Sequence, residues 1–274
     1  MFTDLGHRLS NGILRVAKLA LSPFSYSRKL AIGAWIGRNV LVHVPMAKKR
    51  AVRNLDRVYP DMSAGDKRAF LSKLGDNTGR VLVEEMMMDR FMADPDRVRL
   101  CGPGLEAVDA ALAQGRGIIL CSAHYGNWEG TRLWLRHHRD TPVAGVYRPH
   151  NNPHYNDDFE AALAHVSPHN FPKGRKGTRD LMRHLRGGGV AAILVDQKQS
   201  GAPMIPFLGH PAETTLTAAK LALSLDLLLV PTLTTRAADG ETFDSIFGQP
   251  IAHTDEDTMT RAVNDQLSEW IFEQ

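Results

Sequence analysis

The chain has 274 residues, of which 43% are hydrophobic, and this is enough for one large domain or two small ones with a well-packed core. Its only two cysteines, Cys101 and Cys121, form no CxxC pair and no cysteine–histidine cluster at zinc spacing, which argues against a disulfide framework and a structural metal. The net charge is +3, and it is unevenly distributed along the chain.

The first 53 residues are strongly basic. They hold ten Lys or Arg against one acidic residue, a balance of +9, so the rest of the chain carries −6. Large apolar side chains lie between these charges at roughly helical spacing, which favours an anionic membrane surface over nucleic acid as the partner. Charged residues interrupt every apolar run before it reaches the ~18–20 residues of a membrane span. We expect peripheral or monotopic attachment from the cytoplasmic side; a helical subdomain packed on the core is the alternative.

Helical periodicity continues to about residue 95, with a helix cap expected at Ser63. We expect residues 1–95 to form a helical, membrane-associating segment and residues 96–274 to form an α/β catalytic domain. In that second part, short apolar runs alternate with helical stretches. The expected strands are 117–123, 142–148, 190–196 and 227–236, and the expected helices are 104–115, 127–138, 156–166, 177–188 and 214–226. This alternation predicts a mostly parallel or mixed central sheet flanked by helices.

Polar residues follow three of the expected strands, where ligands of such sheets bind. His124 follows the first strand, Arg148 ends the second, and Asp196 ends the third. We therefore expect these three side chains at one edge of the sheet.

The segment "HYGNWE" places His124 five residues before Glu129. Asn127 is the expected cap of the following helix and is also expected to contact substrate. A carboxylate in the first turn of that helix is favoured by the helix dipole. Glu129 is expected to accept a hydrogen bond from one ring nitrogen of His124, leaving the other free to take a proton. The alternative is a strand-end histidine bonded to a cap, without a catalytic role.

Other chemistries fit this segment less well. No GxSxG motif occurs, which excludes an α/β-hydrolase nucleophile elbow. One histidine and one carboxylate are too few ligands for zinc, and Cys121 is more typical of a buried small hydrophobe than of a nucleophile. The base would therefore activate a hydroxyl brought by the substrate.

"HYGNWE" resembles the HX4(D/E) signature of glycerolipid acyltransferases, and its setting is similar to the bacterial lipid A biosynthesis acyltransferase family. Four blocks in order carry the resemblance, "RNLDRVYPDMS", "SAHYGNWE", "GVYRPHNNPHYND" and the long segment from "VAAILVDQKQ" to "VPTLTTR". The resemblance implies a thioester donor, normally on acyl carrier protein, a membrane glycolipid acceptor such as a lipid A precursor, and no cofactor or metal. It also implies the cytoplasmic face of the bacterial inner membrane, His124 as general base, Glu129 as its orienter, and Arg148 and Asp196 as site residues.

Several further residues are candidates for substrate binding. Arg148 suits a phosphate, a carboxylate or the developing oxyanion, and an ion pair with Asp196 or Glu129 is its alternative role. Thr214 or Thr215 is expected to cap a helix whose N–H groups are available to an anion. The basic loop with Lys173 and Arg175 suits a phosphorylated sugar or an acidic carrier, or is simply solvated. Arg132 and Arg136 are expected to line the same entrance as this loop.

Two differences from the family argue against assigning the family's substrates directly to this chain. The basic leader is less hydrophobic than in relatives, and the chain lacks their tryptophan-rich tail with His-x-Arg-Trp, so the acceptor could differ. The competing hypotheses are an acyl-CoA-dependent acyltransferase on a lysophospholipid or other glycolipid, a non-catalytic membrane- or carrier-binding homologue, and a thioesterase in which His124 activates water.

Overall fold

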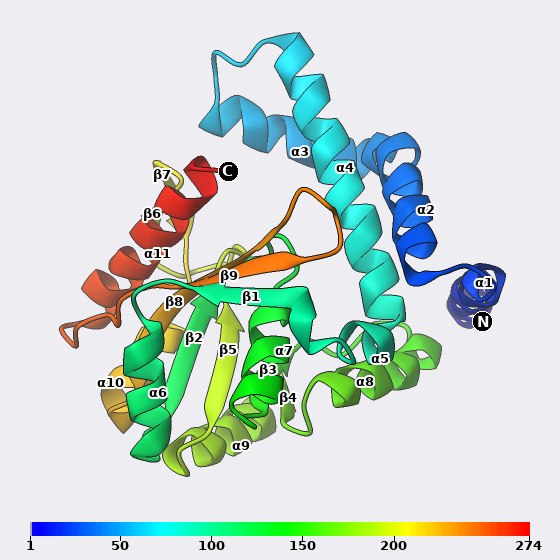
Figure 1. Cartoon of the computed structure of the whole chain (residues 1–274). Coiled ribbons are helices and arrows are strands. Elements are labelled where there is room, and N and C mark those ends of the chain that lie inside the picture. Colours follow the sequence, from blue (N-terminus) through cyan, green and yellow to red (C-terminus); the bar gives the residue numbers. More distant parts are fainter. Residues whose placement is uncertain (1) are drawn as a thin grey trace. The chain divides into compact units, whose positions relative to one another are not determined.

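The computed structural model describes residues 2–274, apart from the side chains at positions 2–5, 9, 10, 13, 14 and 154 (Figure 1). It contains two compact units, Met1–Ala93 with His150–Ala162, and Asp94–Pro149 with Leu163–Gln274. Part of one expected helix, 156–166, therefore falls in the first unit. The division of the protein into functional domains at residues 95 and 96 stays a prediction.

The first unit is helical. Ser63 caps α4 as expected, because its side chain accepts a hydrogen bond from the backbone N–H of Asp66 at 3.1 Å. The helices of this part of the chain are α1 (Phe2–Leu21), α2 (Tyr26–Asn39), the 3₁₀ turn η1 (Leu41–His43), α3 (Pro45–Val58), α4 (Ala64–Met86) and α5 (Met88–Phe91). The helix α8 (Pro153–Val166) contributes its residues up to Ala162 to this unit.

Two GxxxG pairs let α2 and α4 approach closely. Gly33 and Gly37 on α2 face Gly75 and Gly79 on α4, and a Cβ added to Gly37 would lie 1.8 Å from the carbonyl oxygen of Gly75. Only hydrogen in place of a side chain permits this backbone-to-backbone contact. The four-residue spacing of both pairs is visible in the sequence, in "GAWIG" and "GDNTG".

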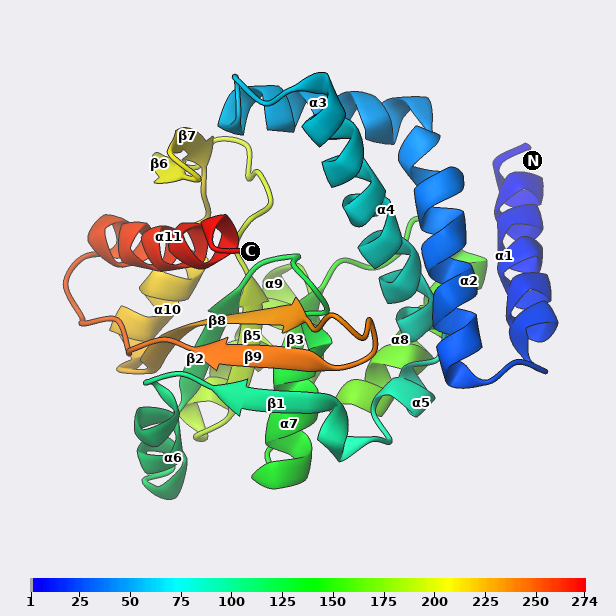
Figure 2. The same ribbon diagram turned by 45° about the horizontal axis from the view of Figure 1, so that its top comes forward.

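The second unit contains a seven-stranded mixed sheet of order β1-β9-β8-β2-β5-β3-β4. The strands β8, β2, β5, β3 and β4 run parallel, while β9 is antiparallel to β8, and Figure 2 shows β1, β9 and β8 side by side. These strands are β1 (Val98–Cys101), β2 (Ile118–Ser122), β3 (Val143–Tyr147), β4 (Asn170–Pro172), β5 (Val190–Leu194), β8 (Leu228–Arg236) and β9 (Phe243–Phe247). The α/β fold class and the mostly parallel, mixed sheet are confirmed.

Helices cover the sheet, and a hairpin extends from it. One core cluster joins alternate residues of β2 and β5 to apolar residues of three helices. The helices of this unit are the 3₁₀ turn η2 (Pro95–Arg97), α6 (Leu105–Ala113), α7 (Glu129–His138), the end of α8, α9 (Arg175–Arg186), α10 (Thr217–Leu225) and α11 (Glu256–Phe272). The hairpin pairs β6 (Met204–Phe207) with β7 (His210–Glu213). The helices α9, α10 and α11 belong to the core cluster, and α7 contacts β1, β3, β8 and β9.

Among residues 2–274, no single helix is both long and apolar enough to cross a bilayer. The segments Tyr26–His43 and Pro45–Val58 pass this test only when taken together, as a pair bent by 84°.

Candidate active site

The site begins at the carboxyl ends of β2 and β5, which are adjacent parallel strands. Ser122 lies in register with Leu194, so the residues two positions further along each strand, His124 and Asp196, meet just beyond the sheet. Asp196 Oδ1 lies 2.8 Å from His124 Nδ1, and its Oδ2 accepts the backbone N–H of His124 at 3.0 Å. The His124 and Asp196 side chains are 33% and 19% exposed, so the pair is open to a substrate.

This contact determines the tautomer of the imidazole. A carboxylate only accepts hydrogen bonds, so Nδ1 of His124 carries the hydrogen and Nε2 presents a lone pair. The side-chain amide nitrogen of Gln197 lies 3.3 Å from that Nε2. The ring of Trp128 meets the imidazole edge-on, with centroids 4.9 Å apart, and restricts its rotation.

The expected contact between Glu129 and His124 is wrong, because Glu129 has a different partner. Its side chain is 7% exposed, and Arg132, 4% exposed, donates from Nη1 to Oε2 at 2.9 Å and to Oε1 at 3.2 Å. Glu129 lies in the first turn of α7, where its carboxylate turns toward Arg132 one helical turn further on. Asp196, 72 residues away in the sequence, holds the imidazole instead.

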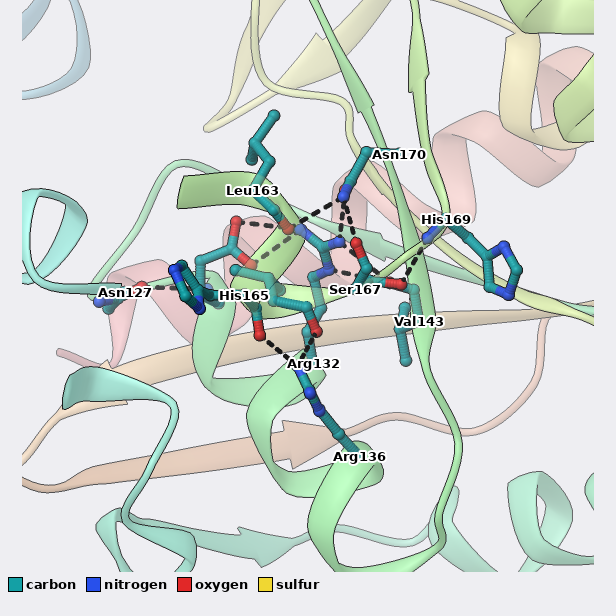
Figure 3. Close-up of polar contacts among 11 residues, drawn as sticks. Asn127, Arg132, Arg136, Val143, Leu163, His165, Ser167, His169 and Asn170 are labelled. Atoms are coloured by element: carbon teal, nitrogen blue, oxygen red, sulfur yellow. Dashed lines mark hydrogen bonds and ion pairs between the residues drawn. The ribbon is translucent and has the colours of Figure 1, made fainter. Parts of the chain in front are cut away.

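Arg132 is the centre of a buried polar network rather than part of an entrance, which corrects a second expectation (Figure 3). It donates from Nε and Nη2 to the carbonyl of Val143 at 3.1 and 3.0 Å, and from Nη2 to Oδ1 of Asn170 at 2.8 Å. Asn170 in turn donates to the carbonyls of Ser167 and Leu163 at 2.6 and 3.0 Å. The network thus ties α7 to β3 and β4 immediately beside the His124 loop.

Space for this network depends on a glycine in β3. A Cβ added to Gly145 would lie 3.0 Å from both Arg132 Nη1 and Asn170 Oδ1. Arg136, also expected at the entrance, donates to the carbonyls of His165 and Val166 and so fastens α7 to the end of α8 (Figure 3). The three-residue spacing of Glu129 and Arg132 is visible in the sequence. No sequence pattern predicts that Asn170 lies beside Arg132.

Asn127 makes the hydrogen bond expected of a cap, although the residue that directly precedes α7 is Trp128. Asn127 is 1% exposed, and its Oδ1 accepts the backbone N–H of Glu129 at 3.0 Å. This fixes the start of α7, and therefore the short loop that leads from His124 into the helix. Burial makes Asn127 a support of the loop; its expected contact with substrate stays a prediction.

The basic candidates lie beyond two other strands of the same sheet. Arg148 follows β3, and Lys173 follows β4, with the Lys173 N–H donating to the carbonyl of Tyr147 at 2.7 Å. Arg175 is the first residue of α9. All three side chains are exposed. The alternative in which Asp196 or Glu129 serves mainly as an ion-pair partner of Arg148 is disfavoured, because these carboxylates hold His124 and Arg132.

Thr214 and Thr215 have different environments. Thr215 Oγ1 accepts the backbone N–H of Thr217 at 3.2 Å at the start of α10, which is a capping interaction. Thr214 is 4% exposed, donates to the carbonyl of Ala212 and lies 3.4 Å from the amide of Asn264. The threonine that caps the helix is therefore Thr215, and substrate contact by either residue stays a prediction.

Cys121 lies within β2 and is fully buried. Burial raises the pKa of its thiol to about 12, so the reactive thiolate is scarce at neutral pH. This supports its interpretation as a small core residue. Within residues 2–274, no group of three or more His, Cys, Asp or Glu is arranged to hold a metal ion.

Comparison with known proteins identifies the family. A family model described as bacterial lipid A biosynthesis acyltransferase matches residues 9–274. The lipid A biosynthesis lauroyltransferase of Escherichia coli K12 is 27% identical over 227 residues, which are 80% of this chain and 71% of that protein. A lipid A biosynthesis acyltransferase of Haemophilus influenzae is 26% identical over 239 residues, 83% of this chain and 74% of the relative.

A phosphatidylinositol mannoside acyltransferase of Mycobacterium tuberculosis is also similar. It is 31% identical over 133 residues, which are 47% of this chain and 42% of that protein. The match thus covers less than half of either chain. Because the family model spans nearly the whole sequence, the chain belongs to the bacterial lipid A biosynthesis acyltransferase family and is an acyltransferase.

Proposed function

We propose that the protein transfers a fatty acyl group from a thioester donor to a hydroxyl of a membrane glycolipid such as a lipid A precursor. The observation that carries this proposal is the His124–Asp196 pair, in which a carboxylate binds Nδ1 and leaves the lone pair of Nε2 for another partner, in a side chain that is 33% exposed. In the described part of the chain, residues 2–274, the side-chain contacts of the His124 ring are with Asp196, Gln197 and Trp128, none of which is a serine or cysteine nucleophile. A base and its orienter in this setting match direct transfer between two bound substrates.

The proposed reaction has two steps. His124 Nε2 takes the proton of the acceptor hydroxyl while its oxygen forms a bond to the thioester carbonyl carbon, and the carbonyl electron pair moves onto oxygen. The tetrahedral intermediate then collapses, the carbon–sulfur bond breaks, and the thiolate takes the proton from the imidazolium. Asp196 holds the ring and stabilises its positive charge in both steps.

The basic residues at the same edge of the sheet are suited to anionic parts of the substrates. Arg148 can bind a phosphate of the acceptor in bidentate fashion. Lys173 and Arg175 provide exposed positive charge for an acidic carrier protein. Together with the family resemblance, this leads us to propose acyl carrier protein as the carrier of the donor. No further cofactor takes part in this reaction.

A transfer assay with two donors and two acceptors tests the proposal. Labelled acyl groups would be supplied on acyl carrier protein or on coenzyme A, with a lipid A precursor or a mannosylated phosphatidylinositol as acceptor. The second acceptor is included because of the similarity to the mycobacterial enzyme. We expect transfer from the carrier protein to the lipid A precursor, and a loss of about 10²-fold or more in His124→Ala.

Unchanged transfer by His124→Ala would contradict the base mechanism. Label released as free fatty acid without an acceptor would instead support a thioesterase. Activity only with the mannosylated lipid would identify mannosylated phosphatidylinositol, and not the lipid A precursor, as the acceptor. The proposed acyl-transfer mechanism would still hold.

We also propose that the first unit attaches the enzyme to an anionic membrane surface. Large apolar side chains are exposed around the end of α2 and the start of α3, namely Trp35 (57% exposed), Ile36 (37%), Val40 (51%), Val44 (45%) and Met46 (75%). Exposed cations follow directly at Lys48, Lys49 and Arg50. Apolar residues beside positive charge are typical of an interfacial membrane contact.

Sedimentation with lipid vesicles tests this attachment. We expect binding to vesicles containing phosphatidylglycerol, weaker binding to phosphatidylcholine alone, and a loss of binding in the double variant Trp35→Ser/Met46→Ser. Phe272→Ser is the matched control, because it removes an exposed aromatic (48% exposed) from α11. An equal loss of vesicle binding in Phe272→Ser would contradict the proposed surface. Binding that does not depend on the anionic lipid would contradict it as well.

A further inference from the structure

Gln197 follows directly after Asp196 and faces the basic nitrogen of the catalytic pair. Because Nδ1 of His124 carries the hydrogen, Nε2 is an acceptor, and the group opposite it must be a donor. The Gln197 side chain meets this requirement with its amide nitrogen at 3.3 Å. In the free enzyme, an amide N–H thus occupies the place where the O–H of the acceptor substrate must bind.

The backbone around Gln197 is fixed on both sides. On one side, Val195 N–H donates to the carbonyl of Ser122 at 3.0 Å, and Asp196 is held by the backbone and ring of His124. On the other side, Lys198 Nζ lies 2.7 Å from Glu213 Oε2. A substrate hydroxyl can therefore displace the amide group by side-chain rotation alone, while the amide stays next to the reacting atoms.

Glu213 anchors this loop to β7 through several contacts. Its Oε1 accepts the N–H of Gly201 at 2.9 Å, and its carbonyl accepts the N–H of Gln199 at 3.0 Å. The hydrogen bond from Lys198 holds the pKa of Glu213 below its ordinary value, so this carboxylate stays ionised to a lower pH than an ordinary glutamate. The loop backbone is thus held in place, so only the side chain of Gln197 has to move when the acceptor hydroxyl binds.

We propose that Gln197 is a catalytic residue whose side-chain amide donates a hydrogen bond to the thioester oxyanion, after the acceptor hydroxyl has displaced it from His124. The inference rests on the proposed function. The attacking oxygen lies at Nε2, and the carbonyl oxygen that gains the negative charge is one carbon atom away from it. An amide displaced from Nε2 by side-chain rotation lies within reach of that oxygen and stabilises its charge as the bond forms.

Four variants test the role, with acyl carrier protein bearing a labelled acyl thioester as donor and a lipid A precursor as acceptor. Gln197→Met keeps the length of the side chain and removes both donors, and Gln197→Glu replaces the donors by an acceptor. Gln199→Met is the matched control, because this exposed glutamine lies on the same loop, whereas the glutamine that contacts His124 is Gln197. His124→Ala reports on the base itself, and thermal melting verifies that all variants fold.

We expect Gln197→Met to lower kcat by about 10²- to 10³-fold with little change in KM, and Gln197→Glu to lower it at least as much. Gln199→Met should retain the activity of the unaltered enzyme. A kcat of Gln197→Met equal to that of Gln199→Met, or a loss confined to KM, would overturn the assignment. If His124→Ala retains transfer, the proposed base mechanism fails. If His124→Ala loses transfer while both Gln197 variants keep it, the oxyanion role alone fails.

Discussion

Two carboxylates flank the same short loop, and they have opposite environments. Asp196 lies at the open end of the sheet and binds both the backbone and the ring of His124. Glu129, only five residues from His124 in the sequence, lies buried against Arg132. The register of parallel strands, rather than nearness in the sequence, decides which acid serves the base.

The comparison implies different consequences of mutation. Loss of Asp196 should release the imidazole and leave the fold intact, because the pair lies at the surface of the unit. Loss of either member of the Glu129–Arg132 pair should leave an uncompensated charge among buried groups, which is costly.

Removing the buried guanidinium is expected to have the largest effect on stability. Arg132→Met leaves Glu129 and Asn170 without their donor, and we expect a loss of about 3–5 kcal/mol in the free energy of unfolding. Thermal and urea melts measure this. The double variant Arg132→Met/Glu129→Leu should recover much of the loss, and a double variant as unstable as the single one would contradict the account of the pair.

Filling the space beside the network should have an intermediate effect. In Gly145→Ala, the new methyl group would press on Arg132 and Asn170, and we expect a loss of about 1–3 kcal/mol. Gly187→Ala serves as the control, because its Cβ would meet nothing closer than 3.4 Å. If the melting temperatures of the two variants fell equally, the network would have enough space for a methyl group at position 145.

The smallest effect is expected at the cap of α7. Asn127→Ala removes the oxygen that accepts the Glu129 N–H, and we expect a loss of about 1 kcal/mol. Asn127→Ser retains a capping oxygen and should be closer to the unaltered protein in a urea melt. Equal losses in both variants would indicate that the buried amide, rather than the cap, is what stabilises the loop.

The sequence predicted the sheet well where strands are long and apolar. The strands β2, β3, β5 and β8 were expected within two residues of their ends, because continuous apolar runs bounded by glycine, proline or charged residues are strong signals. The strand β4 has only three residues, and β9 alternates apolar with polar residues in an acidic segment, so neither was distinguished from loop. The β6–β7 hairpin was also missed; it turns at Leu208 and Gly209, both with positive φ.

The prediction of the site was partly correct, because it also depended on where the long apolar strands end. His124 and Asp196 were found because both follow strands, whose carboxyl ends meet at one edge. Their direct contact depends on β2 and β5 being neighbours in register, which one sequence does not show. Burial of Arg132 was missed because it depends on Asn170, 38 residues away, and on the space at Gly145.

Nitrogen-15 NMR of the His124 ring tests the central claim most directly, namely that Asp196 rather than Glu129 orients the base. The spectra of the unaltered protein, Asp196→Ala and Glu129→Gln would be compared at a pH where the ring is neutral. We expect the Nδ1–H tautomer in the unaltered protein and in folded Glu129→Gln, and a mixture of tautomers in Asp196→Ala. An unchanged tautomer in Asp196→Ala, together with its loss in Glu129→Gln, would contradict the claim.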